Sequence, residues 1–241
     1  MRIDSHHHVW DLSVREQGWM VGEALDPIKK NFSINDLRQA IAGCGIEKTV
    51  VVQTVTNYDE TPELLELAED DELVAGVVGF LKIDSGDAIS HLDKYESMRG
   101  FKHLVGIRDI AHDYEDIGYL AKPEVVENVQ ELGRRGLVYD LLTKTPHMQA
   151  AIDLVKQSPG TQFVLDHISK PYMDRFEFNT DSLVIEKGMG RYLREWSGMF
   201  DAMFSGTGDP FKNKNTPTGE RYMSAATIQR YMEKSAYPGY R

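Results

Sequence analysis

Short apolar runs alternate with longer amphipathic stretches along the chain as far as Pro171. This alternation is typical of βα units, in which helices connect the parallel strands of one sheet. The runs are rich in Val, Ile and Leu with few polar interruptions, as expected of strands that are covered on both faces. The sequence therefore predicts six strands, at residues 3–8, 49–54, 73–80, 104–108, 137–142 and 162–167.

Helix signals lie between these runs. Ser33 is expected to cap a helix that extends to Ala42, and Gly43 and Gly45 are expected to end it. Three prolines are each expected in the first turn of a later helix: Pro62, with Thr61 as its cap, then Pro123 and Pro146.

Six βα units and a length of 241 residues fit a single parallel β/α barrel, which typically needs about 250 residues, although the length alone would also allow two small domains. Beyond Pro171 the alternation weakens. Residues 182–185 favour a seventh strand and residues 225–232 a helix, so the barrel is expected to be distorted or incomplete after its sixth strand.

Composition excludes several classes of function. A net charge of −11 without a basic cluster disfavours nucleic acid as a partner. The chain shows neither a long apolar span nor the layout of a signal peptide, so we expect a cytoplasmic protein that does not bind membranes. Cys44 is the only cysteine, which excludes an intrachain disulfide, and we expect it to be a small buried residue.

Two histidines stand out in the first predicted strand. Side chains two residues apart in a strand share a face, so His6 and His8 point together and His7 points away. At the C-terminal end of a barrel strand this pair could chelate a divalent metal such as zinc, with Asp4 hydrogen-bonded to a ligating imidazole. The alternatives are a chance polar cluster or the remnant of a purification tag.

Further polar residues lie at the ends of later strands. His167 ends the sixth strand and is a plausible third metal ligand, although a single histidine is more often a packing residue. Arg108 ends the fourth strand and could grip a carboxylate or a lactone carbonyl, or instead pair with Asp109 or Asp113.

Other residues are candidates for substrate binding. Gln53 could donate hydrogen bonds to substrate oxygens, and only one of Tyr139 and Asp140 can face inward. Trp10 and Trp19 could form an apolar platform for a sugar ring or could simply pack in their loop.

Four segments together resemble the amidohydrolase-related sugar lactonases, which include L-fuconolactonase, L-rhamnonolactonase and 2-pyrone-4,6-dicarboxylate lactonase. The order and spacing of these segments agree with that family over residues 1–172, and residues 173–241 form a divergent tail. The segments are IDSHHHVWD at 3–11, VVVQTVTNYDET at 50–61, VGIRDIAHD at 105–113, and GLVYDLL with FVLDHISKP at 136–142 and 163–171.

The resemblance implies a single α/β domain, a TIM-type (β/α)8 barrel of the metal-dependent hydrolase kind that opens a lactone. His6, His8, Arg108 and His167 match the family's site residues. Metal dependence varies in the family, so one divalent metal, most plausibly zinc, or none is expected. The family also has an aspartate on its eighth strand as general base. Its nearest counterpart here is Asp209, in the poorly matching segment 203–211.

We therefore expect a hydrolase of carbohydrate metabolism that acts on a small lactone, with a sugar lactone or sugar acid as its ligand. Two alternatives stay open. One is a metal-dependent decarboxylase of the same superfamily, and the other is a truncated, non-catalytic homologue that assembles as a homo-oligomer to cover its sheet edges.

Overall fold

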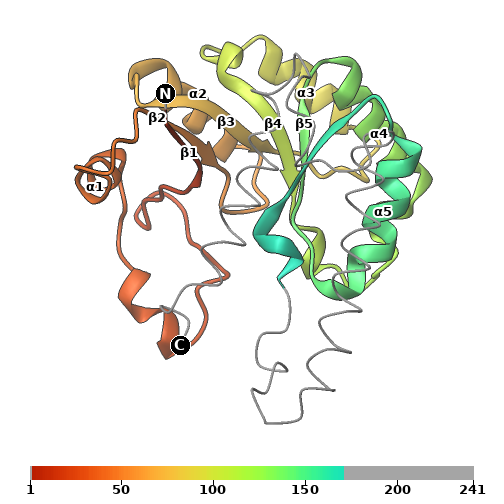
Figure 1. The fold of residues 1–241 in the computed structure, drawn as a ribbon, viewed down its shortest axis with the longest axis horizontal. Coiled ribbons are helices and arrows are strands. Elements are labelled where there is room, and N and C mark those ends of the chain that lie inside the picture. The colour runs from red at the N-terminus through yellow and green to blue at the C-terminus, as the bar shows by residue number, and fades with distance from the viewer. Residues whose placement is uncertain (1, 171–241) are drawn as a thin grey trace. The chain divides into compact units, whose positions relative to one another are not determined.

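The computed structural model describes residues 2–170 (Figure 1). Its described residues divide into two compact units: unit 1 comprises 2–82 and 87–108, and unit 2 comprises 83–86 and 109–170. Asp209 and the predicted elements at 182–185 and 225–232 lie outside the described residues. Within residues 2–170, no helix is both long and apolar enough to cross a membrane.

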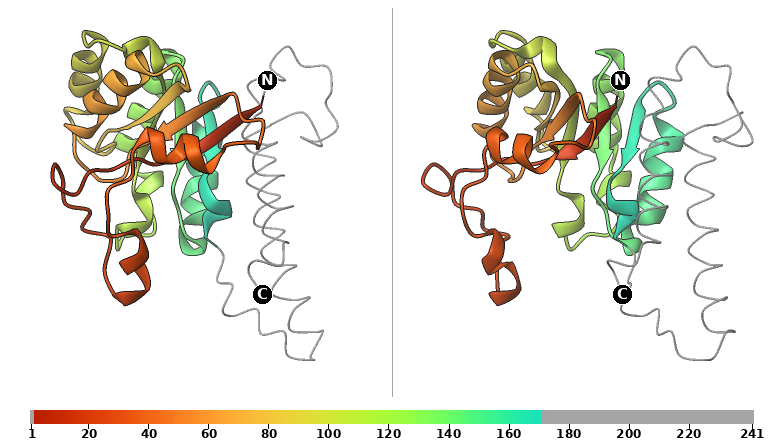
Figure 2. Two further views of the ribbon diagram at one scale, coloured as in Figure 1. Left: turned by 90° about the vertical axis from the view of Figure 1, so that its left-hand side faces the viewer. Right: turned by 60° about the vertical axis from the view of Figure 1, so that its left-hand side comes forward.

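Unit 1 is built on parallel strands that pair in chain order, β1 with β2, β2 with β3 and β3 with β4. Because the strands are parallel, their C-terminal ends lie at one edge of the sheet. The segment between β1 and α1 extends away from the strands (Figure 2). The elements are β1 (Ile3–His7), η1 (Glu23–Ile28), α1 (Ile34–Ala40), β2 (Lys48–Val52), α2 (Glu60–Asp70), β3 (Val74–Phe80), α3 (Ala88–Glu96), η2 (Phe101–His103) and β4 (Leu104–Asp109).

Unit 2 contains two parallel strands, paired in register from Val138 with Gln162 to Leu141 with Leu165. Helices α4 and α5 present apolar faces that are buried in this unit. The elements are η3 (Ala111–Asp113), η4 (Tyr119–Ala121), α4 (Pro123–Arg134), β5 (Val138–Leu141), η5 (Thr145–His147), α5 (Met148–Gln157), β6 (Gln162–Leu165) and η6 (Asp166–Ser169).

All six predicted strands are confirmed, and each is followed by helical structure as in successive βα units. The predicted ends are less accurate. The sixth strand ends at Leu165 rather than at His167, because the chain turns there into the short helix η6, where His167 has a φ of 52°. Parallel strands alternating with helices place the described chain in the predicted α/β class.

The helix starts were predicted with mixed success. Ser33 caps α1 in a capping box with Asp36, as expected. Thr61 was wrongly assigned as a cap: α2 begins at Glu60, and the Thr61 hydroxyl instead accepts the Phe80 backbone N–H at 2.9 Å. Pro123 starts α4 as predicted, whereas Pro146 lies in η5, just before α5.

Close packing in the core of unit 1 explains why position 79 is a glycine. A Cβ on Gly79 in β3 would lie 2.5 Å from the Thr61 side chain, so α2 approaches the strand closely only because position 79 has no side chain. Cys44 corrects another prediction. Its side chain is exposed rather than buried, because it lies in the turn between α1 and β2 and not on a face of an element.

Candidate active site

The histidines of β1 have the predicted orientation. His6 Nε2 lies 3.2 Å from His8 Nε2, and the two rings meet edge to face with centroids 4.9 Å apart. His7 points elsewhere: it is buried, with Nε2 3.0 Å from the Thr49 hydroxyl. A chance cluster at a frayed end would show neither the strand pairing nor these specific contacts.

Unit 1 also fixes the protonation pattern of His8. Its Nδ1 lies 2.7 Å from the Val52 carbonyl oxygen, which can only accept, so Nδ1 carries the proton. In the neutral ring Nε2 then has a lone pair directed toward His6. Bonds of about 2.0–2.1 Å at a tetrahedral zinc separate two nitrogens by about 3.3 Å. The observed Nε2 separation of 3.2 Å fits such a pair of ligands.

His7 and Asp4, the neighbours of this pair in β1, make contacts within the fold. Burial lowers the pKa of His7, which favours its neutral ring. Asp4 Oδ1 accepts the His6 backbone N–H at 3.3 Å. The Asp4 carboxylate therefore stabilises the backbone that carries the histidine pair.

Arg108 and Gln53 form a reciprocal contact between β4 and the end of β2. Arg108 Nη2 donates to the Gln53 carbonyl oxygen at 2.5 Å, and the Gln53 amide donates to the Arg108 carbonyl oxygen at 3.3 Å. Both side chains are buried. One N–H of the Gln53 amide is therefore used within the fold, and the contact orients the guanidinium at the C-terminal edge of the sheet.

The two tryptophans of the first loop pack on each other. Trp10 and Trp19 are edge to face at 5.9 Å, and Trp10 also packs on Phe32 at 5.1 Å. The Trp10 indole donates to the Lys30 carbonyl oxygen at 2.8 Å. Trp10 thus closes the base of its loop, while Trp19 has 41% of its surface exposed. A sugar platform at this position stays a prediction.

His167 lies in unit 2, beyond the end of β6. His167, Ser169 and Lys170 all have positive φ values, of 52°, 55° and 45°. This left-handed backbone is costly for residues with a side chain, and it tends to occur where function requires it. The Ser169 hydroxyl, 2.6 Å from that of Thr143, ties the turn to the loop after β5. His6 and His8 belong to unit 1, so their grouping with His167 stays a prediction.

Tyr139 and Asp140 of β5 are both buried, because this strand is covered on both faces. Tyr139 packs edge to face on Phe163 at 6.4 Å. Burial raises the pKa of its hydroxyl well above the ordinary value. Neither residue is exposed to solvent on the described chain, so substrate binding by Tyr139 also stays a prediction.

Sequence reasoning named Asp109 only as a possible partner of Arg108 and missed the buried network that this carboxylate forms in unit 2. Asp109 has no exposed surface and accepts hydrogen bonds from the Tyr119 hydroxyl at 2.6 Å, the Ile110 N–H at 2.7 Å and the Ile83 N–H at 3.1 Å. The Tyr114 hydroxyl adds a contact of 3.1 Å. Burial nevertheless raises the pKa of Asp109. Its position directly after Arg108 was the available signal.

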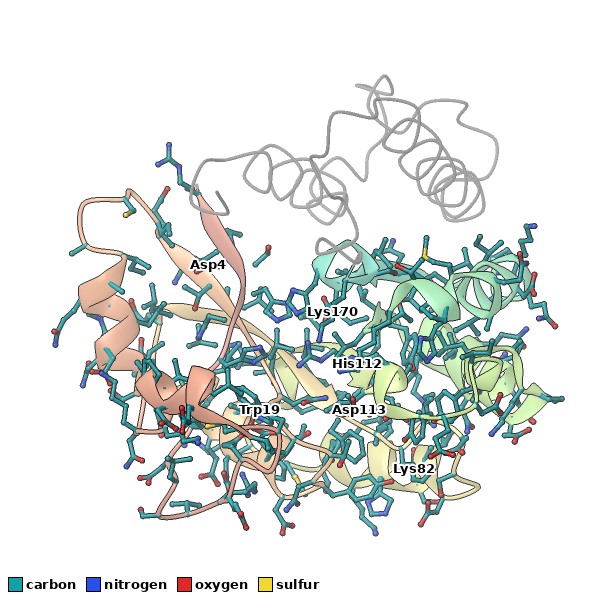
Figure 3. All side chains as sticks on the ribbon, turned by 90° about the horizontal axis from the view of Figure 1, so that it is seen from below. Asp4, Trp19, Lys82, His112, Asp113 and Lys170 are labelled. Carbon is teal, nitrogen blue, oxygen red and sulfur yellow. The ribbon has the colours of Figure 1, made fainter. Side chains whose placement is uncertain are left out.

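A basic cluster in unit 2 was also missed. His112, Lys144 and Lys170 come from the loops after three different strands and meet around the His112 side chain and carbonyl group. Figure 3 shows His112 together with Lys170 and Asp113. No spacing rule links these three positions, so the sequence gives little warning of the cluster.

A comparison with known families identifies the chain. The amidohydrolase family model Amidohydro_2 matches residues 3–182, which is most of the sequence. The chain belongs to the amidohydrolase family. Two curated relatives of this amidohydrolase are L-fucono-1,5-lactonases, from Burkholderia ambifaria (30% identity over 170 residues, 70% of this chain and 57% of the relative) and Burkholderia multivorans (25% identity over 189 residues, 76% and 60%). The chain thus spans about three fifths of their length.

A solved structure supports the fold of this amidohydrolase. A Burkholderia multivorans amidohydrolase with bound zinc superposes with a TM-score of 0.68 and 20% identity, covering 99% of this chain and 94% of the other. This confirms the α/β fold of the amidohydrolase barrels. The Nε2 separation of the histidine pair on β1 suits two ligands of one metal ion.

Proposed function

We propose that the protein is a hydrolase that opens a small lactone, of the sugar-lactone class, by attack of water on the ring carbonyl. The observation that carries the proposal is the His6 and His8 pair, with its two Nε2 atoms 3.2 Å apart and His8 Nδ1 held by the Val52 carbonyl. The lactonase relatives supply the reaction class.

In this proposal His6, His8 and His167 hold one divalent metal, with zinc preferred because imidazole nitrogen suits it. When bound, such a metal polarises a carbonyl oxygen and lowers the pKa of water. By holding the proton on His8 Nδ1, the Val52 carbonyl would leave the Nε2 lone pair available to bind such an ion. A metal-independent reaction, with the imidazoles acting on the substrate, is the alternative form of the proposal.

Arg108 is proposed to anchor substrate oxygens, since its guanidinium offers several donors in a fixed plane. Its contact with the Gln53 carbonyl would keep that plane oriented. Trp10, Gln53 and Tyr139 remain proposed contributors to substrate binding. A carboxylate must take the proton of the attacking water, and Asp209 is the proposed general base.

The test is a panel of aldonolactones incubated with the full chain, with acid release followed by a pH indicator. Metal-stripped protein is compared with protein supplied with zinc or manganese. Opening of at least one lactone well above the buffer rate is expected. Equal rates with and without protein under every metal condition would refute the lactonase proposal, and release of carbon dioxide from an aromatic acid would favour a decarboxylase.

A further inference from the structure

Three basic side chains of unit 2 gather at the C-terminal ends of consecutive strands. Lys144 Nζ donates to the His112 carbonyl oxygen at 3.4 Å, and Lys170 Nζ lies 3.5 Å from His112 Nε2. His112 follows β4, Lys144 follows β5 and Lys170 follows β6. Ligands of parallel α/β folds bind at this edge of the sheet.

The loops that carry these residues are fastened to each other. The His112 backbone N–H donates to the Leu142 carbonyl oxygen at 3.0 Å, which ties the loop after β4 to the end of β5. The hydroxyls of Thr143 and Ser169, at 2.6 Å, tie the loop after β5 to η6. These contacts between the loops preorganise the cluster.

The position of Lys170 has an energetic cost. Its φ is 45° and that of Ser169 is 55°, and a left-handed conformation is unfavourable for a residue with a side chain. This turn brings the Lys170 ammonium group toward the His112 imidazole, and Lys144, from the loop after β5, places a second ammonium group at the His112 carbonyl oxygen. An arrangement that combines backbone strain with gathered positive charge would be stabilised by a bound anion.

We propose that His112, Lys144 and Lys170 bind a carboxylate of the substrate, so that the preferred substrate is a lactone that carries a free carboxylate group. This inference rests on the proposed lactonase function for the reaction and on unit 2 alone for the binding group. Lys170 lies three residues after His167 in the same turn of unit 2, so the carboxylate would bind close to this proposed metal ligand.

The surrounding charges favour a carboxylate over a phosphate. Asp113 Oδ1 lies 3.1 Å from His112 Nε2. This carboxylate offsets part of the positive charge of the cluster. A ligand with a single negative charge therefore matches the cluster more closely than a phosphate dianion does.

The experiment compares D-glucaro-1,4-lactone, which carries a carboxylate, with the neutral D-glucono-1,4-lactone in the full chain. We expect a higher kcat/KM for the carboxylated lactone. Lys170→Met and Lys144→Met are each expected to lower the ratio of the two kcat/KM values about 10- to 100-fold, as for loss of a hydrogen bond to a charged group. Lys170→Arg should restore part of the ratio.

The matched control is Lys156→Met, which removes the same charge from an exposed position in α5 and should leave the ratio unchanged within about fivefold. Calorimetry with glucarate and gluconate provides a readout that does not need turnover. Glucarate is expected to bind more tightly, and Lys170→Met should abolish the difference. Thermal unfolding of each variant separates misfolding from loss of the subsite.

The outcomes separate the two proposals. Opening of the neutral lactone with no preference for the carboxylated one, and equal binding of glucarate and gluconate, would overturn the subsite and leave the lactonase intact. Lysine-dependent glucarate binding without opening of any lactone would keep the subsite and refute the lactonase. A stronger preference for 6-phosphoglucono-1,5-lactone than for the carboxylated lactone would overturn the assignment to carboxylate.

Discussion

The two units present their histidines in different ways. In unit 1, His6 and His8 are aligned by the regular alternation of β1, and a backbone carbonyl fixes the tautomer of His8. In unit 2, His167 follows its strand in a turn with left-handed backbone, held by the hydroxyl contact between Thr143 and Ser169. The first arrangement uses the geometry that any strand provides, whereas the second uses strain and specific side-chain bonds.

This difference has a consequence for mutation. A strand keeps its side-chain alternation when one residue is replaced, so changes in β1 should act on chemistry and leave the backbone in place. A strained turn depends on the few contacts that hold it, so changes beneath η6 should move the backbone as well. The predictions below test that contrast.

The largest effect is expected from His8→Gln in unit 1. Removal of this proposed ligand should lower lactone opening about 1,000-fold, because a metal contributes several kcal/mol to the transition state. Bound zinc, measured by atomic absorption after gel filtration, should fall in parallel. His7→Gln, on the opposite face of the strand, is the matched control and should retain zinc. If both variants lost zinc equally, the histidines would act only through the fold.

The next largest effect is expected from Asp109→Asn in unit 2. The Tyr119 and Tyr114 hydroxyls and two backbone N–H groups donate to this carboxylate. In the variant, the NH2 group of the amide cannot accept hydrogen bonds, so some of these donors would lose their acceptor. We expect unfolding free energy, measured in urea, to fall by about 3 kcal/mol. Tyr114→Phe, which removes one donor, should cost less.

The pH dependence of the Asp109→Asn effect has a defined sign. Burial raises the folded-state pKa of Asp109 above its ordinary value of 3.8, so the folded protein keeps a proton that the unfolded chain releases. The stabilising contribution of Asp109 is complete below pH 3.8 and decreases as pH rises through the folded pKa. The stability difference between the original protein and the variant should therefore narrow with increasing pH. A difference that widened would contradict the raised pKa.

The strands could be predicted because apolar runs are local signals, and the start of α1 could be predicted because its cap, Ser33, is local as well. The pairing of His6 with His8 also followed from strand alternation alone. The position of His167 could not be predicted, since the sequence Asp-His-Ile-Ser reads as the continuation of a strand. Only tertiary contacts hold the chain in the left-handed conformation that ends β6 at Leu165.

The polar networks were missed for a related reason. Asp109 and Glu60 are buried carboxylates whose partners include backbone N–H groups, and a sequence does not show which backbone groups lack a partner. The start of α2 was misplaced by the same effect. Glu60 takes the N–H groups of Thr54 and Val55, so the helix begins before the Thr61–Pro62 signal.

The hydroxyl contact between Thr143 and Ser169 offers a smaller test of the strained turn. Thr143→Val removes the hydroxyl that contacts the buried Ser169 hydroxyl. We expect the free energy of unfolding to fall by about 2 kcal/mol. Because this bond helps to hold the turn that carries His167, lactone opening should also fall. The Thr143→Val, Ser169→Ala double variant should regain stability but not activity. A double variant that regained both would separate the turn from the chemistry.

The smallest effect is expected from Tyr95→Phe in unit 1. The Tyr95 hydroxyl lies 3.1 Å from the carbonyl oxygens of both Tyr58 and Phe80, and its loss should cost about 1 kcal/mol without a change in zinc binding or lactone opening. Burial raises the pKa of Tyr95 to about 12 from 10.0. The unfolded chain therefore ionises first, and the contribution of Tyr95 declines between pH 10 and 12. Urea unfolding across that range should show a shallower decline in the variant. An equal decline in both proteins would mean that Tyr95 ionises as easily in the fold as in the unfolded chain.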